Sequence, residues 1–238
     1  MITEPHIASA FDRDLEAIQA LVMRMGGLVE QATLDTARAL ETRDEELART
    51  VQARDKAIDA LEAQVHDECA RVIATRQPTA TDLRTVLSVL KVASGLERMG
   101  DYAKNIAKRT SVLATFTPIE GTAGTVRRMA KQVEQMLKDA LDAYIRRDAA
   151  LAADVRARDQ EVDQIYNSLF RVLLTHMLED PRNITACMHL HFIAKNVERM
   201  GDHATGIAEQ VIYLVTGAMP EEPRPKDDRT PFVASVNH

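Results

Sequence analysis

The chain is poor in aromatic residues and contains no tryptophan. Aromatics make up 4% of its 238 residues, and it has only nine glycines and eight prolines. Sheets favour aromatic and β-branched residues, whereas the abundant Ala, Leu, Glu, Arg and Met of this chain favour helices. The composition therefore excludes a sheet-rich fold and predicts an all-α protein.

Cysteine, excess positive charge and long apolar runs are scarce as well. The two cysteines, Cys69 and Cys187, lie within helical patterns at a spacing that matches no metal or redox motif, so we expect buried packing residues. A net charge of -6 with scattered basic residues argues against a nucleic-acid partner. The first residues lack the features of a signal peptide, and no run of about 18 apolar residues could cross a bilayer. We expect a cytoplasmic protein without a membrane span.

One pentapeptide is present twice. Residues 97–101 read Glu-Arg-Met-Gly-Asp, and residues 198–202 repeat these five letters. The repetition extends further, because an offset of 104 residues aligns Ala53-Arg54-Asp55 with Ala157-Arg158-Asp159. Towards the pentapeptides the offset becomes 101, as expected when a gap falls at a turn. The whole chain is therefore predicted to be a structural repeat.

Each half has three helical patterns. The first helix is predicted to start with a capping box of Ser9 and Asp12. The second runs from about Glu45 to Thr75. The third starts after a cap at Thr79, and its counterpart starts with Asp180 as cap and Pro181 at the first helical position.

Long helices joined by short turns pack as antiparallel neighbours. We therefore predict two tandem three-helix bundles, at residues 8–112 and 126–217. The connection between them, residues 113–125, is rich in glycine and proline. Residues 218–238 contain four prolines and alternating charges, and we expect them to be disordered.

The pentapeptides place two acidic residues, four positions apart, on an otherwise apolar helical face. The preceding helix of each half carries another acidic pair with the same spacing. Carboxylates about 5 Å apart repel by roughly 3 kcal/mol at an effective dielectric of 20, so converging pairs require cations or protons. A divalent metal that prefers oxygen ligands would meet this requirement. The candidate residues are Asp55, Asp59, Glu97 and Asp101 in the first half and Asp159, Asp163, Glu198 and Asp202 in the second.

A solvated helix face with ion pairs is the alternative interpretation. It suits the first half, where Lys104 and Lys108 follow Asp101 at spacings of three and seven. The second half has Thr205 and Glu209 at those positions, which favours ligation there. Spacing alone leaves both interpretations open.

Glycine and histidine occur beside the acids. Gly100 and Gly201 interrupt helices at a cost of about 1 kcal/mol each, and we expect them to permit a close approach of a neighbouring segment or ligand. His191 and His203 could join a site. The other half has no histidine at the position aligned with either of them. A partly buried histidine with its hydrogen bonds satisfied is therefore the simpler interpretation of each.

Several linked motifs make the chain resemble the PhoU family of phosphate-signalling regulators. Both pentapeptides are followed by Ala and then by Ile-Ala, at Ile106-Ala107 and Ile207-Ala208. The segments at residues 77–84 and 211–217 are also similar to that family. The resemblance covers about residues 8 to 217 in the right order.

The resemblance implies a pair of three-helix bundles, usually dimeric, whose acidic motifs in some members bind clusters of iron, zinc or other metals. Carried over, the ligands would be Glu97, Asp101, Glu198 and Asp202, with Asp55, Asp59, Asp159 and Asp163 at the family's acidic positions on the preceding helix. Manganese or magnesium would suit the same oxygen ligands. Two departures could shift which half binds metal better: Gly206 stands opposite Asn105, and Tyr102 replaces a residue that is often His.

The resemblance further implies an adaptor without established catalytic activity. The family acts between the ATPase subunit of a phosphate ABC transporter and a sensor histidine kinase, limits phosphate uptake and keeps the phosphate-starvation response off. The sequence agrees, because it has no phosphate-cradling glycine loop, nucleophile elbow or His-Glu-x-x-His. A carboxylate-bridged metalloenzyme and a purely structural scaffold are the alternatives.

Overall fold

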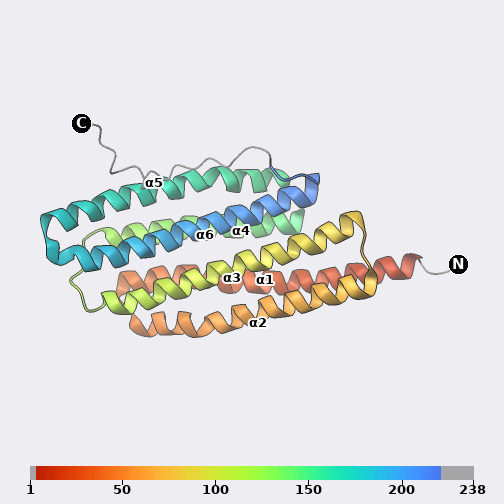
Figure 1. The fold of residues 1–238 in the computed structure, drawn as a ribbon, viewed down its shortest axis with the longest axis horizontal. Helices are drawn as coiled ribbons and strands as arrows, with labels where there is room; N and C mark the ends of the chain where they lie inside the picture. The colour runs from red at the N-terminus through yellow and green to blue at the C-terminus, as the bar shows by residue number, and fades with distance from the viewer. Residues whose placement is uncertain (1–3, 221–238) are drawn as a thin grey trace.

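The computed structural model describes residues 4–220, with side chains from residue 10 onward. Within that range the chain is helical and contains no strand (Figure 1). The all-α prediction is confirmed. The elements are α1 (Glu4–Thr42), α2 (Glu45–Arg76), α3 (Ala80–Leu113), α4 (Thr122–Arg146), α5 (Ala149–Glu179), a 3₁₀ turn η1 (Pro181–Asn183) and α6 (Ile184–Thr216).

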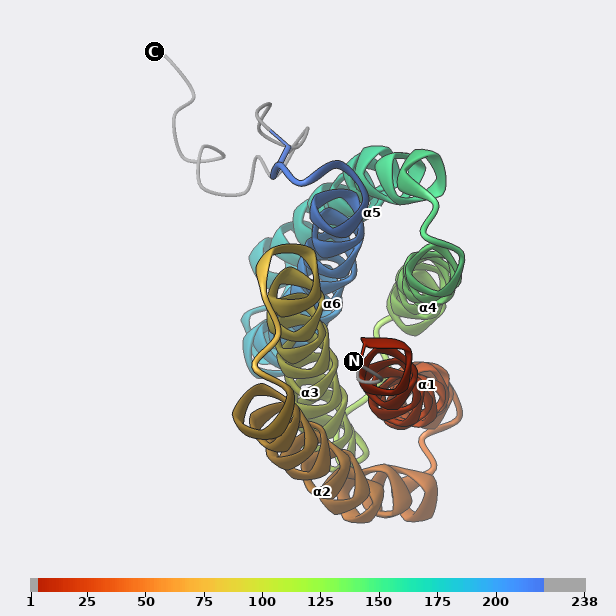
Figure 2. The same ribbon diagram turned by 90° about the vertical axis from the view of Figure 1, so that its right-hand side faces the viewer.

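The helices form two antiparallel three-helix bundles that lie side by side. The first bundle contains α1 to α3 and the second α4 to α6, and they meet where α3 packs on α6 and α1 on α4. Seen end-on, α2, α3, α6 and α5 form one row and α1 and α4 a second, shorter row (Figure 2). The helices that carry the pentapeptides, α3 and α6, are therefore neighbours at the centre of the molecule.

Equivalent contacts in the two halves confirm the repeat. The guanidinium of Arg54 lies 3.2 Å from the carboxylate of Asp35, and that of Arg158 lies 2.6 Å from Asp139, its counterpart at the offset of 104. The N-caps agree too, since Asp44 accepts a hydrogen bond from the Leu47 amide and Asp148 accepts one from Leu151. Residues that the sequence repeat aligns therefore make equivalent contacts in the structure.

Helix ends differ from the prediction in three places. α1 begins at Glu4, so Ser9 lies inside it rather than at its cap. The connection between the bundles is only residues 114–121, because burial of Thr122 and Val126 holds the first turn of α4 against the core in spite of its low helix propensity. After the cap at Asp180 the chain makes the turn η1 first, and α6 starts at Ile184. The predicted disordered tail is residues 218–238. Residues 218–220 follow α6 without helical structure, and residues 221–238 lie outside the described range.

Both cysteines are packing residues, as predicted. Cys69 and Cys187 are free, and neither has measurable solvent exposure. Burial, followed by the nearby charge of Glu68, raises the pKa of the Cys69 thiol to about 11, so it stays protonated and unreactive near neutral pH. No helix of residues 4–220 combines the length and the apolar character required to cross a membrane.

Replacing either of two adjacent glycines of α1 with alanine should have opposite effects on stability. A methyl group at Gly26 would lie 2.4 Å from Leu141 Cδ1 of α4, whereas one at Gly27 would meet nothing within 4 Å. We expect Gly26→Ala to lower the free energy of unfolding by about 1–2 kcal/mol through overpacking. Gly27→Ala should raise it by about 0.5–1 kcal/mol, because alanine favours the helix. Urea unfolding of both variants measures this, and equal effects would refute the packing of α1 on α4.

The same interface predicts a pH-dependent effect at Glu30. Burial raises the pKa of Glu30, and the charge of Glu134 on α4 raises it further. An acid with a raised folded-state pKa destabilises the protein increasingly as the pH rises through that value. Glu30→Gln should therefore increase the melting temperature at pH 8 and leave it unchanged at pH 4. The exposed Glu16→Gln is the control, and equal shifts in the two variants would contradict the assignment.

Candidate metal centre

The two central glycines bring neighbouring helices close to the pentapeptides, as predicted. A methyl group at Gly100 would lie 2.9 Å from Ile58 Cδ1 and 3.7 Å from Asp55 Oδ1 of α2. One at Gly201 would lie 3.2 Å from Asp159 Oδ1 of α5. The absent side chains thus allow the acids of the preceding helix to lie against α3 and α6.

In the first half a lysine joins the two acidic pairs. The ammonium of Lys104 donates hydrogen bonds to Asp55 Oδ2 at 2.5 Å and to Asp101 Oδ1 at 2.6 Å. Burial acts to raise the pKa of Asp101, but the hydrogen bond and charge of Lys104 outweigh it and lower the value. The protein's own cation therefore lies between α2 and α3, and a metal would have to displace it.

The other two acids of the first half lie at its edge. Burial, together with the charges of Asp101 and Glu62, raises the pKa of Glu97 to about 7. Burial and the charge of Asp55 also raise the pKa of Asp59. Glu97 pairs with the exposed Arg98, whose Nε lies 3.6 Å from Glu97 Oε2. This half is partly neutralised around Lys104 and leaves Glu97 in an environment that favours its protonated form.

The second half buries its acids more deeply. Asp159 and Asp163 are each 1% exposed and Glu198 is 2% exposed, while Asp202 is half-buried. Burial and the charge of Asp202 raise the pKa of Glu198 to about 6, and Asp163 adds to the effect. Two helices, α5 and α6, thus place carboxylates in one poorly solvated region.

A lysine also reaches this region, contrary to the comparison made from sequence. Lys195 lies one turn before Glu198, and its ammonium is 3.0 Å from Glu198 Oε1. The alternative drawn from the sequence rested on the lysines that follow the pentapeptide. Lys195 precedes it, at a position where the first half has Ser94. The spacing of three residues on a helix was the available signal. Ion pairing therefore contributes in both halves, through different lysines.

One oxygen of Glu198 remains without a hydrogen-bond partner among the described residues. Oε2 is buried, whereas Oε1 binds Lys195. A buried carboxylate oxygen is costly unless a proton or a cation compensates it. A proton on this oxygen or a hard cation beside it would compensate the burial, and the acids of the second half, Asp159, Asp163, Glu198 and Asp202, are the side chains that would hold such a cation.

The two histidines contact aromatic rings. The His191 ring lies 5.2 Å from that of Phe170 and 6.0 Å from that of Tyr166. The His203 ring lies 5.7 Å from the Tyr102 ring across the junction of α3 and α6.

Within residues 4–220, no group of three or more His, Cys, Asp or Glu side chains has the spacing of a bound metal ion.

Comparison with known families gives the same division of the chain. The family model described as PhoU domain matches twice, at residues 22–110 and 126–211. One match falls within each bundle, and each contains one pentapeptide and the acidic pair of the preceding helix.

Similar proteins span nearly the whole chain. A phosphate-specific transport system accessory protein PhoU homolog of Rhizobium meliloti is 45% identical, over 99% of both chains. Its counterpart in Zymomonas mobilis is 48% identical over 93% of this chain and 94% of its own. The crystal structure of PhoU from Pseudomonas aeruginosa superposes with a TM-score of 0.84 at 40% identity, over 87% of this chain and 100% of that one. The phosphate transport system regulatory protein PhoU of Streptococcus pneumoniae gives 0.82 at 29% identity, over 89% and 100%.

Proposed function

The chain belongs to the PhoU family, and from this premise we propose that it is a negative regulator of phosphate uptake and of the phosphate-starvation response. The observation that carries the proposal is the pair of matches to the PhoU domain, at residues 22–110 and 126–211. Relatives that align over nearly their full length are named as accessory proteins of the phosphate-specific transport system. The relatives are named as accessory or regulatory proteins. We therefore propose that this chain acts by binding other proteins and not as an enzyme.

We propose that these contacts are made in the cytoplasm, where the chain acts as an adaptor. One partner is the ATPase subunit of the phosphate ABC transporter, and the other is the sensor histidine kinase of the phosphate two-component system. Two bundles joined side by side offer separate helical surfaces on which two partners could be held together. We also propose a homodimer, which sedimentation equilibrium of the purified chain would test.

Deletion of the gene tests the regulatory proposal. In medium rich in phosphate, the deletion strain should express a reporter of phosphate-starvation genes at a raised level, and a plasmid copy of the gene should restore repression. Unchanged expression in rich medium would refute the proposal.

A pull-down at high and low phosphate tests the adaptor role separately. The tagged chain should retain the transporter ATPase and the kinase, and retention of at least one should depend on phosphate. If repression is lost on deletion but neither partner is retained at either concentration, the chain regulates by another route.

We propose further that the acidic pairs bind metal, with iron, zinc, manganese and magnesium as candidates. The buried oxygen of Glu198 and the convergence of acids from α5 and α6 support this proposal. The ion pairs of Lys104 and Lys195 favour a second candidate, in which the acids only stabilise the fold. Elemental analysis of protein purified without chelator separates the two. Less than about one metal per chain, with no gain in melting temperature on adding metal, would support the purely structural role.

A further inference from the structure

The two central helices, α3 and α6, enclose a polar groove between them. Seen end-on, α1 and α4 lie on one side of this pair (Figure 2), and no residue of α1 or α4 lines the groove. Its volume is about 340 Å³. The polar residues and the glycine used below are Lys91, Ser94 and Arg98 from α3 and His203, Gly206 and Gln210 from α6. Among the residues that the structure describes, no carboxylate lines it.

The equivalent junction of the other half is filled by larger side chains. At the offset of 101, the replacements are Phe192 for Lys91, Asn196 for Gly95 and Asn105 for Gly206. Arg109, the counterpart of Gln210, covers the Phe192 ring, with its guanidinium carbon 4.5 Å from the ring centre. The repeat therefore has one closed junction and one that is open and polar.

Gly206 keeps the groove open without serving the packing of the helices. A methyl group there would meet nothing within 4 Å, whereas one at Gly95 would lie 3.3 Å from Ile207 Cγ1. A glycine inside a helix costs about 1 kcal/mol relative to alanine. The close approach of α6 accounts for this cost at Gly95. At Gly206 the visible consequence of the missing side chain is the space in the groove.

The cations of the groove are only weakly neutralised by the protein itself. Lys91 is exposed and forms no ion pair with a described residue. Arg98 is 60% exposed and lies 3.6 Å from Glu97 and 3.9 Å from Asp101, so these pairs contribute little. Asp101 is held by the closer ammonium of Lys104, at 2.6 Å. Both cations of the groove thus remain available to an anion.

A buried amide adds a donor that has only a weak acceptor. Gln210 is 8% exposed, and its Nε2 lies 3.8 Å from the sulfur of Met219, its one hydrogen-bond acceptor among the described residues. A thioether sulfur accepts hydrogen bonds weakly, and a buried amide without a good acceptor is costly. An oxygen atom in the groove would provide that acceptor.

We propose that the α3–α6 groove binds a phosphate group, supplied either as inorganic phosphate or by a nucleotide. Lys91 and Arg98 provide the positive charge, and the guanidinium suits two oxygens at once. Ser94, His203 and Gln210 add hydrogen-bond donors. Five donor groups exceed what the two oxygens of a carboxylate can use, whereas a phosphate presents more oxygens and more charge.

This inference goes beyond the regulatory proposal, which concerns contacts with proteins. The binding assay below can fail while the reporter of phosphate-starvation genes still responds to deletion, and the reverse is equally possible. If both succeed, the chain senses phosphate directly.

The ³¹P resonance of inorganic phosphate measures binding to the full chain. The titration uses about 150 mM KCl, which screens non-specific attraction, and a chelator that removes metal. We expect saturable line broadening that sulfate reverses, since sulfate has a similar shape and charge. Adenosine monophosphate distinguishes the two sources. An affinity at least tenfold above that of inorganic phosphate assigns the groove to a nucleotide, and an equal or lower affinity assigns it to free phosphate.

Four variants locate the binding. Lys91→Gln and Arg98→Gln should each raise the Kd of phosphate about fivefold or more. Arg199→Gln removes the same charge at the counterpart of Arg98 and should change the Kd less than about twofold. Gly206→Leu should fill the groove and abolish binding. Its control is Gly27→Leu, at an exposed glycine of α1 where a methyl group also meets nothing within 4 Å. Circular dichroism melting confirms that each variant is folded.

Three results would overturn the proposal. The first is the absence of saturable binding by the wild-type chain. The second is an equal effect of Arg98→Gln and Arg199→Gln, or undiminished binding by folded Gly206→Leu. The third is binding that occurs only when metal replaces the chelator, which would place the phosphate on the acidic residues of the candidate metal centre.

Discussion

Lys195→Met is expected to lower the free energy of unfolding by about 2 kcal/mol in metal-free buffer at pH 8. Glu198 is 2% exposed, and Lys195 is the cation that its Oε1 contacts. Removing one member of a buried ion pair typically costs about 3–5 kcal/mol, and the partial exposure of Lys195 reduces this figure. The ammonium also lies 5.0 Å from the centre of the Tyr166 ring, and this contact would be lost as well.

The effect should depend on pH in a defined direction. The pKa of Glu198 is already raised to about 6, and losing the lysine would raise it further. A raised pKa means that stability decreases as the pH rises through the folded-state value, because the folded protein then contains a buried charge. The loss caused by Lys195→Met should therefore be larger at pH 8 than at pH 5.

Thermal and urea unfolding at these two pH values measure the effect. Lys131→Met, at an exposed position of α4, is the control and should change stability by less than about 0.5 kcal/mol. The double variant Lys195→Met with Glu198→Gln should recover most of the loss, since no unpaired charge remains. A stable Lys195→Met protein at pH 8 would show that another group or water neutralises Glu198.

Much of the fold could be predicted because it depends on local patterns that occur twice. The offset of 104 pairs Asp44 with Asp148 and Arg54 with Arg158, and each pair makes equivalent contacts in the two halves. The start of α1 was misplaced, because a Ser-x-x-Asp pattern inside a helix looks the same as one at its end. Helix ends depend on tertiary packing as well as on capping residues.

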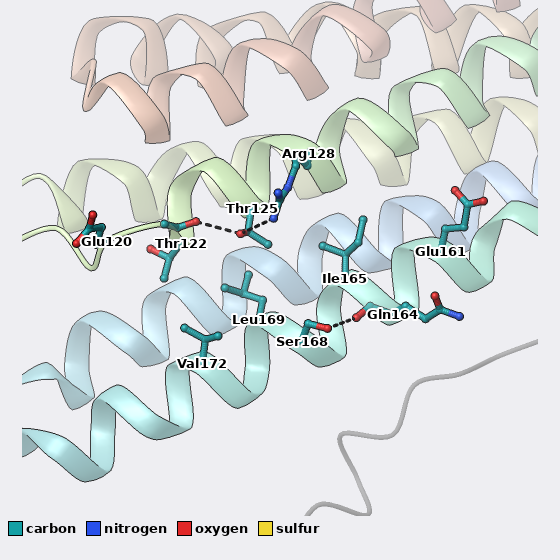
Figure 3. Close-up of a pocket in the computed structure, with 11 residues that line it drawn as sticks. Glu120, Thr122, Thr125, Arg128, Glu161, Gln164, Ile165, Ser168, Leu169 and Val172 are labelled. Atoms are coloured by element: carbon teal, nitrogen blue, oxygen red, sulfur yellow. Dashed lines mark hydrogen bonds between the residues drawn. The ribbon is translucent and has the colours of Figure 1, made fainter.

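The site was harder to predict than the fold. The sequence indicated which acids share a helical face, and the close approaches at Gly100 and Gly201 followed from their cost within a helix. It did not show which lysine reaches which acid, since Lys104 spans from α3 to α2 while Lys195 stays on α6. It also missed the groove between the first turns of α4 and the middle of α5, which is lined by small side chains such as Thr125 and Ser168 (Figure 3).

Replacing Asp159 and Asp163 together with asparagine is expected to abolish stabilisation of the second half by metal. If the proposed site exists, a metal present at about 1,000 times its dissociation constant stabilises the wild-type chain by about 4 kcal/mol. The double variant should gain none of this. Melting temperatures with and without manganese, zinc, magnesium or ferrous iron measure the difference. The matched variant with Asp55→Asn and Asp59→Asn alters the first half and should retain the response of the second.

The stability of the same double variant without metal tests whether these acids serve metal binding or folding. Both aspartates are 1% exposed, and the charge of Asp163 contributes to the raised pKa of Glu198. Asparagine keeps the shape of these side chains and removes the repulsion. Acids that lower the stability of the empty protein and raise that of the loaded one serve ligand binding rather than folding. If the double variant is instead less stable without metal and the wild type gains nothing from metal, the acids of the second half act as structural ion-pair partners.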